Sequence, residues 1–209
     1  ENNFYELFSL GKLSYTGKFP KNENIDIPKS EIKLVICENC KLVQVSKEFD
    51  LNYMYDDNYG YRTGINHTMK SHVKSIVREL SLKKKFLIKG DYVLDIASND
   101  ATLLNAYQKN LTRVGIDPTI NKYRKFYKKI DFKISNFFSK RRLVSIIKDN
   151  KFKTITALAV FYDLKNPNQF LKEISEIIDE KKGIFILEFQ DLLSIIKNNL
   201  FDTICHEHL

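Results

Sequence analysis

The chain has 209 residues, a formal net charge of +8, 43% hydrophobic residues and 29% charged residues, which is typical of a folded globular protein. Its apolar runs are far shorter than the roughly 18–20 residues of a membrane span, and its first residues lack the order of a signal peptide. We therefore expect a cytoplasmic protein with no membrane partner.

The positive charge is spread along the chain. Lysines alternate with acidic residues on the expected helix faces, and the tightest basic runs, at 83–85 and 140–142, lack interleaved aromatic side chains. This pattern favours a solvated surface over a nucleic-acid interface, so we expect no nucleic-acid partner. The three cysteines are too few, and odd in number, for a disulfide scaffold.

Residues 1–60 contain turn signals and two expected strands, at 31–36 and 41–46. Cys37 and Cys40 form a C-x-x-C pair at the turn of the hairpin between them. Two thiolates at this spacing suit half of a tetrahedral zinc site. Buried thiols or a redox pair are the alternatives, because the chain has no second C-x-x-C.

The next segments predict a helix and then a parallel sheet. Apolar residues recur at helical spacing over 66–82, and from residue 90 short apolar strands alternate with helices. Such a sheet is covered on both faces and binds ligands at the carboxyl ends of its strands. The expected strands are 92–96, 113–116, 132–134, 154–160 and 183–187, with an amphipathic helix from Pro167 to Gly183 before the last.

The loop after the first of these strands is the first candidate site. Ala97, Ser98 and Ala101 are small, so a nucleotide-like ligand could approach the backbone. Asp117 ends the second strand, 22 residues after Asp95, where an acidic residue can bind both hydroxyls of a ribose. The missing glycines count against a dinucleotide site.

An ordinary strand–loop–helix connection explains the same loop equally well. Ser98, Asn99 and Asp100 are common helix-capping residues. The residues alone therefore leave the ligand site and the simple connection as open alternatives.

Two further segments carry polar side chains of chemical interest. Tyr59, Tyr61 and Arg62 belong to a tyrosine-rich segment that could line a polar substrate cleft or pack at a domain junction. Near the end of the chain, His206 and His208 flank Glu207. The two histidines could form a metal-binding arm, and a histidine beside Glu207 could form an acid/base pair with it. A polar chain end is the alternative.

These segments occur together, and their order resembles the sugar C-methyltransferases, which methylate a carbon of a nucleotide-linked keto-deoxysugar. That family has an N-terminal zinc-binding domain with two C-x-x-C pairs, a tyrosine-rich segment and a Rossmann-like S-adenosylmethionine domain. The matching segments are Cys-Glu-Asn-Cys-Lys-Leu-Val-Gln at 37–44, Val-Leu-Asp-Ile-Ala-Ser-Asn-Asp-Ala-Thr-Leu-Leu at 93–104, Gly-Ile-Asp-Pro at 115–118, Asn-Phe-Phe at 136–138 and Phe-Asp-Thr-Ile-Cys-His-Glu-His at 201–208.

The resemblance implies an α/β fold, with a small zinc-ribbon-like β domain before an incomplete Rossmann-like class I methyltransferase domain. The implied boundaries are 1–62 for the zinc-binding-like domain, 63–88 for a linking helix and 89–209 for the truncated S-adenosylmethionine domain. The first cysteine pair would precede residue 1 and a C-terminal domain would follow residue 209. We therefore expect the chain to be inactive alone.

The resemblance also assigns site residues and partners. Asp117 would bind the ribose of S-adenosylmethionine, and Glu207 or His208 would remove the proton from a sugar carbon beside a ketone. Tyr59 and Tyr61 would line the site of the nucleotide-sugar substrate. The remaining implied cofactor residues are Asp95, Ala97, Ser98, Asn99, Asp100, Pro118, Asn136 and Phe137, and the implied zinc ligands are Cys37 and Cys40.

The chain departs from the family at four of these places. Ala97 and Ala101 stand where the family usually has glycine, Cys205 stands where a tyrosine is common, and Asp163 replaces a histidine of some members. A degenerate, non-catalytic binding module is therefore the alternative function. A nucleic-acid methyltransferase has only the net charge in its favour.

Overall fold

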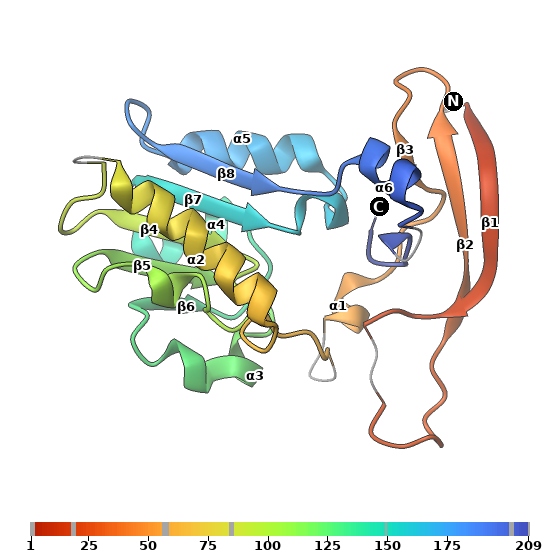
Figure 1. Ribbon diagram of the computed structural model, residues 1–209, viewed down its shortest axis with the longest axis horizontal. Helices are drawn as coiled ribbons and strands as arrows, with labels where there is room; N and C mark the ends of the chain where they lie inside the picture. Colours follow the sequence, from red (N-terminus) through yellow and green to blue (C-terminus); the bar gives the residue numbers. More distant parts are fainter. Residues whose placement is uncertain are drawn as a thin grey trace. The chain divides into compact units, whose positions relative to one another are not determined.

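The computed structural model describes residues 3–17, 20–55, 59–83, 86–148, 150–200 and 203–208 (Figure 1). These residues form two compact units, each with a sheet of its own. The first unit lies within Glu1–Gly60, Tyr162–Lys165 and Phe189–Leu209, and the second within Tyr61–Phe161 and Asn166–Glu188.

The second unit is built on a five-stranded sheet in the order β6-β5-β4-β7-β8. All four pairings are parallel, and the strand order reverses beside β4. This is the doubly wound order of Rossmann-like folds, so the predicted α/β class is confirmed. The strands are β4 (Tyr92–Ile96), β5 (Thr112–Ile116), β6 (Phe132–Ile134), β7 (Phe152–Leu158) and β8 (Ile184–Glu188).

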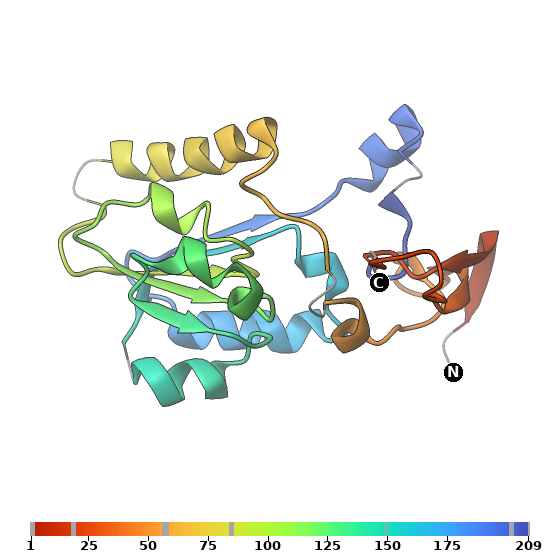
Figure 2. The same cartoon turned by 90° about the horizontal axis from the view of Figure 1, so that it is seen from below.

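Helices cover both faces of this sheet, as the apolar runs predicted. Figure 2 shows α2 (His67–Leu82) along one face and α4 (Lys140–Ile147) and α5 (Pro167–Ile177) along the other. The predicted helix over 66–82 is thus confirmed, but it packs on the sheet rather than only linking two domains. Its buried residues Val73 and Val77 share a core cluster with Val93 of β4.

Shorter turns complete the second unit. The elements between β4 and β6 are η1 (Leu104–Ala106), α3 (Ile120–Tyr123) and η2 (Arg124–Tyr127). After β7 comes η3 (Phe161–Asp163), of which only Phe161 belongs to the second unit. Within the described ranges, we find no helix with the length and apolarity needed to cross a bilayer.

Gly115 in β5 leaves the space into which the neighbouring elements pack. A Cβ atom at this position would lie 2.9 Å from side-chain atoms of Leu104, Ser98 and Tyr127. No larger residue fits there without displacing them. The glycine therefore positions the loop after β4 close against β5.

The first unit contains a three-stranded antiparallel sheet in the order β1-β2-β3. The strands are β1 (Phe4–Ser14), β2 (Lys29–Cys37) and β3 (Val43–Val45), and the short helices are α1 (Leu51–Met54) and α6 (Leu192–Asn198). The predicted hairpin of β2 and β3 is confirmed, with the C-x-x-C pair at its turn. Strand β1 was not predicted from the sequence, because its side chains are mostly exposed and show no single apolar face.

The end of the chain belongs to this first unit. His206 is completely buried, with its ring 4.7 Å from the Phe49 ring and 4.9 Å from the Tyr15 ring. The sequence instead placed the whole segment 189–209 with the nucleotide-binding domain. The packing of these residues with the antiparallel sheet differs from that expectation, and the functional domain boundaries stay a prediction.

Candidate functional site

The loop after β4 has an unusual backbone conformation. Ala97, Asn99 and Ala101 have φ angles of 57°, 45° and 61°, in the left-handed region. For residues with a Cβ atom this region costs about 1–2 kcal/mol, and glycine avoids the cost. At Ala97 and Ala101 the backbone therefore favours glycine, the residue usual at both positions in the family that the chain resembles.

Asp117 ties this loop to the end of β5. Its Oδ2 accepts the backbone N–H of Asn99 at 2.9 Å, and its Oδ1 accepts the N–H and hydroxyl of Thr119 at 2.6 and 2.5 Å. Burial raises the pKa of Asp117, and the bonds from Thr119 and Asn99 oppose that rise. Among the bonds between described residues, Oδ2 uses one of its two acceptor positions, so one is left for a ligand hydroxyl.

Asp95 joins two strands under the same loop. Its carboxylate accepts the Thr156 hydroxyl of β7 at 2.6 Å and is 4% exposed. Burial raises the pKa of Asp95 to about 7, and the nearby Asp117 charge adds to the effect. Asp95 therefore links β4 to β7, and direct contact with a cofactor stays a prediction.

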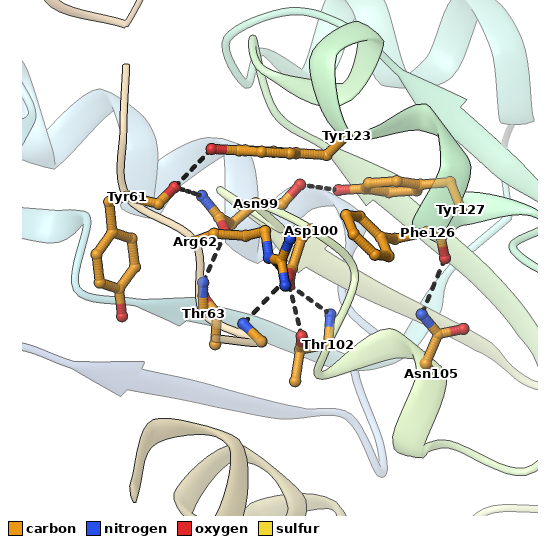
Figure 3. Close-up of polar contacts among 11 residues, drawn as sticks. Tyr61, Arg62, Thr63, Asn99, Asp100, Thr102, Asn105, Tyr123, Phe126 and Tyr127 are labelled. Atoms are coloured by element: carbon orange, nitrogen blue, oxygen red, sulfur yellow. Dashed lines mark hydrogen bonds and ion pairs between the residues drawn. The ribbon is translucent and has the colours of Figure 1, made fainter. Parts of the chain in front are cut away.

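Asn99 uses its side chain to hold the segment that precedes α2. Its Oδ1 accepts the backbone N–H of Thr63 at 2.9 Å, and its Nδ2 donates to the Tyr61 carbonyl at 3.2 Å (Figure 3). The Tyr123 hydroxyl donates to the same carbonyl at 2.8 Å. The tyrosine-rich segment thus contacts the loop through its backbone rather than through the Tyr61 ring.

Asp100 makes the second set of contacts with this segment. Its Oδ2 accepts the Gly64 N–H at 3.0 Å and lies 3.2 Å from Nε of Arg62 (Figure 3). The Arg62 guanidinium also lies over the Phe126 ring, 4.6 Å from its centroid. A Cβ atom at Gly64 would come within 2.5 Å of Asp100 Oδ2, so the close approach requires glycine.

Ser98 and Tyr127 complete the hydrogen bonding around the loop. The Tyr127 hydroxyl donates to the Asn99 carbonyl at 2.8 Å and lies 2.7 Å from Ser98 Oγ. Because a tyrosine hydroxyl has one proton, Ser98 is the donor in the second bond. Sequence reasoning missed Tyr123 and Tyr127, since their positions in short helical turns gave no pattern that pointed to the loop.

Pro118, Asn136 and Phe137 follow the carboxyl ends of β5 and β6, at the same edge of the sheet as the loop. The Pro118 carbonyl accepts the Ser135 hydroxyl at 3.2 Å, and the Asn136 side chain accepts the Phe137 N–H at 2.9 Å. The topology therefore brings the predicted cofactor residues to one edge of the second unit.

Glu207 and His208, the two candidates for the catalytic base, lie in the first unit. Nδ1 of His208 is 2.6 Å from the Thr203 carbonyl, which can only accept, so Nδ1 carries the proton and Nε2 has the lone pair. Burial lowers the pKa of His208. Glu207 Oε2 accepts the Thr16 hydroxyl at 2.6 Å. Phe201 and Asp202, which open the matching sequence segment, lie outside the described residues.

The two predicted substrate tyrosines belong to different units. The Tyr59 ring lies 4.8 Å from the Tyr55 ring in the first unit. Tyr61 lies in the second unit, with 44% of its surface exposed. Residues 56–58 between these tyrosines are outside the described part of the chain. A shared role of the two rings stays a prediction.

Cys37 is the last residue of β2 and Cys40 lies in the turn that follows, and both are free thiols. The backbone N–H groups of Cys40 and Asn39, followed by the Cys40 thiol, lower the pKa of Cys37. Lys41 completes the tight turn with a φ of 63° and an N–H bond to the Cys37 carbonyl at 2.8 Å. Among the described residues no third metal-ligating side chain joins this pair.

No protein-family model matches the chain. Among curated proteins, the chain is 22% identical over 179 residues to the C-methyltransferase NovU from Streptomyces niveus, a match that covers 85% of this chain and 42% of that protein. The chain therefore spans less than half the length of this relative. The match supports the predicted relation to C-methyltransferases, whereas neither a sugar substrate nor a zinc-binding domain is shown.

Solved structures of methyltransferases resemble part of the chain. The plantazolicin methyltransferase BpumL, in complex with a pentazolic desmethylPZN analog and SAH, is 17% identical with a TM-score of 0.48 and covers 63% of this chain and 50% of its own. The CurJ carbon methyltransferase is 11% identical with a TM-score of 0.46 and covers 66% of this chain and 41% of its own. We base no conclusion on either structure, because both TM-scores are low.

Proposed function

We propose that the protein is an S-adenosylmethionine-dependent methyltransferase that acts on a carbon of a nucleotide-linked keto-deoxysugar. The observation that carries this proposal is the bond between Asn99 and Asp117, which joins the loop after β4 to an acidic side chain at the carboxyl end of β5. This edge is where doubly wound sheets bind nucleotides. The C-methyltransferase relative supports the type of reaction.

The residues at this edge fit the adenosylmethionine that the proposal requires. Ala97, Ser98 and Ala101 are small, so a ligand can approach the loop backbone. Asp117 Oδ2 would accept a ribose hydroxyl, and Asn136 and Phe137 would lie on the adenine side. When bound, the cofactor would supply the methyl group.

We assign the removal of the substrate proton to His208. Its Nδ1–H is held by the Thr203 carbonyl, so the Nε2 lone pair is fixed in direction. Because burial lowers its pKa, His208 stays neutral and able to accept a proton at neutral pH. Glu207 either orients this ring or accepts the proton itself, and Tyr59 and Tyr61 would contact the sugar.

The proposal includes a structural zinc ion and a cytoplasmic location. Cys37 and Cys40 lie on one tight turn, and the amide groups that lower the pKa of Cys37 favour its thiolate form. These two residues fit half of a tetrahedral zinc site. The partner that the proposal names is the nucleotide-sugar substrate.

Two observations favour the alternative, a binding module without turnover. Ala97 and Ala101 hold strained conformations on the cofactor loop, and three hydrogen bonds from Asn99 and Thr119 already engage the Asp117 carboxylate. A loop fixed in this way could bind a nucleotide and yet perform no chemistry.

Calorimetric titration with S-adenosylmethionine tests the proposal first. We expect one equivalent to bind the purified protein, and Glu207→Gln to bind equally, because Glu207 is assigned no contact with the cofactor. A folded protein that binds no cofactor would refute the proposal. Methyl transfer from labelled cofactor to a nucleotide-linked keto-deoxysugar, measured on the product of the complete gene, then separates the enzyme from the binding module.

A further inference from the structure

A second group of metal-ligating side chains lies near the end of the chain, in the first unit. Sγ of Cys205, a carboxylate oxygen of Glu207 and a ring nitrogen of His208 all lie within 4.8 Å of one another. The His208 N–H bonds the Cys205 carbonyl at 3.3 Å, which closes a turn over these residues. The backbone thus holds three different ligand types on one side of a turn.

The orientation of His208 is the one found for histidine ligands of metals. Such residues donate one ring N–H to a carbonyl or carboxylate, which fixes the tautomer and directs the other nitrogen at the ion. Here Nδ1 donates to the Thr203 carbonyl at 2.6 Å, and Nε2 is left with its lone pair. The Tyr162 ring packs against the imidazole with 4.3 Å between centroids, which further fixes the ring.

Hydroxyl groups also hold the carboxylates of Glu207 and of the nearby Asp163. Glu207 Oε2 accepts the Thr16 hydroxyl at 2.6 Å, and Asp163 Oδ2 accepts the Tyr55 hydroxyl at 2.8 Å. Asp163 is 5% exposed, yet its Oδ1 finds no hydrogen-bond donor among the described residues. An unpartnered buried carboxylate oxygen is costly, and a positive charge nearby would reduce that cost.

The Glu207 carboxylate of this group has no cationic partner within the described part of the chain, where no ion pair involves it or the nearby Asp163.

We propose that Cys205, Glu207 and His208 bind a divalent cation of the zinc class. Thiolate, imidazole and carboxylate together select zinc over magnesium or calcium, which prefer oxygen ligands alone. Tetrahedral zinc ligands lie roughly 3.5 Å apart, so small side-chain rotations close the observed group around an ion. Binding replaces the Cys205 thiol proton, which is released to solvent.

This site is distinct from the Cys37–Cys40 pair and does not rest on the proposed methyltransferase function. Its ligand Cys205 stands at a position where a tyrosine is common in the family that the chain resembles. The ion would occupy the His208 lone pair that proton removal requires. Zinc would therefore inhibit the proposed chemistry.

Cobalt titration of the double variant Cys37→Ser/Cys40→Ser tests the site, because this variant keeps Cys205 as its one thiol. We expect one equivalent of Co²⁺ to bind with a thiolate-to-cobalt charge-transfer band, and Zn²⁺ to abolish the band. Adding Cys205→Ser should remove the band, with the fold checked by circular dichroism.

A second variant tests the support of the ligands without altering any of them. Thr16→Val removes the hydroxyl that holds Glu207, so metal affinity should fall roughly tenfold to a hundredfold. Ser9→Ala, a substitution at an exposed residue of the same unit, is the matched control. It should bind Co²⁺ with the same affinity as the double variant. The proposal is overturned if the double variant binds no Co²⁺, or if the band persists after Cys205→Ser.

Discussion

Asn99 donates its backbone N–H to the Asp117 carboxylate over 2.9 Å, so the loop after β4 and the end of β5 are held together by a buried hydrogen bond. The same asparagine holds Thr63 and Tyr61 through its side chain. One residue therefore connects the candidate ribose acceptor to the segment before α2, and changes at Asp117 will affect both structure and ligand binding.

The ribose assignment of Asp117 is best tested with a ligand that lacks the hydroxyl in question. We expect the parent to bind S-adenosylhomocysteine about tenfold to a hundredfold more tightly than its 2′-deoxy analogue, since a bond to a charged group contributes about 1.5–3 kcal/mol. Asp117→Asn should lose most of this discrimination. Calorimetry on protein shown to be folded measures it, and equal discrimination by parent and variant would contradict the assignment.

Glycine at the two strained alanine positions should have unequal effects on stability. Ala97→Gly relieves a left-handed backbone and should raise the free energy of unfolding by about 1 kcal/mol. Ala101→Gly relieves the same strain but removes a fully buried methyl group, a loss of about 0.8 kcal/mol, so its net effect should be near zero. Urea unfolding followed by circular dichroism compares them, and a destabilised Ala97→Gly would show that the loop is not strained there.

The base assignment predicts a specific loss of proton exchange. In deuterated water, with a nucleotide-linked keto-deoxysugar and no cofactor, the protein should exchange the hydrogen beside the ketone. His208→Ala should slow exchange roughly a hundredfold to ten-thousandfold, and Glu207→Gln should also slow it. Exposed His67→Ala is the control. If both variants exchange at the parent rate, the pair is not the base.

Asp95 should give the second unit a pH-dependent stability. Its folded pKa of about 7 exceeds the reference value of 3.8, so the folded state binds more protons than the unfolded state between these values. The free energy of unfolding should therefore fall as pH rises through this window, by at most about 1.4 kcal/mol per unit. Asp95→Asn keeps an acceptor for Thr156 but cannot ionise, so its stability should fall less over this range.

The control for that experiment is Glu79→Gln on the exposed face of α2. It removes a carboxyl from the same unit without touching the sheet. Unfolding midpoints in urea at pH 4, 5, 6 and 7 give the comparison. If Asp95→Asn follows the parent as closely as Glu79→Gln does, then Asp95 does not carry the effect.

Strong local patterns made the parallel sheet predictable. Strand β4 reads as an apolar run because both its faces are buried, and Val73 and Val77 of α2 recur at helical spacing because one face meets the sheet. Strand β1 could not be predicted in the same way. Its Phe4, Tyr5 and Phe8 side chains are all largely exposed, so pairing with β2, rather than burial, defines that strand.

The loop after β4 and Asp117 could be predicted as a candidate site, but the residues that contact the loop from other segments could not. Asp117 and the loop residues were identified because small and acidic residues at strand ends have a known chemistry. The contacts of Arg62 and Tyr123 depend on a backbone carbonyl and an aromatic ring from distant parts of the chain, and no local pattern encodes those. The resemblance located Glu207 and His208, but only the structure shows that Thr203 sets the tautomer of His208.

The position of His206 has a consequence for how the protein assembles during synthesis. Its ring is 3.2 Å from the Ser30 carbonyl although the two residues are 176 positions apart, and Thr16 and Glu207 are 191 positions apart. Contacts between residues so far apart in the sequence form late and slow folding. A ribosome-bound chain that ends before residue 203 would hold the complete parallel sheet but would lack the ring that packs against Phe49, so the antiparallel unit should be the last to become protease-resistant.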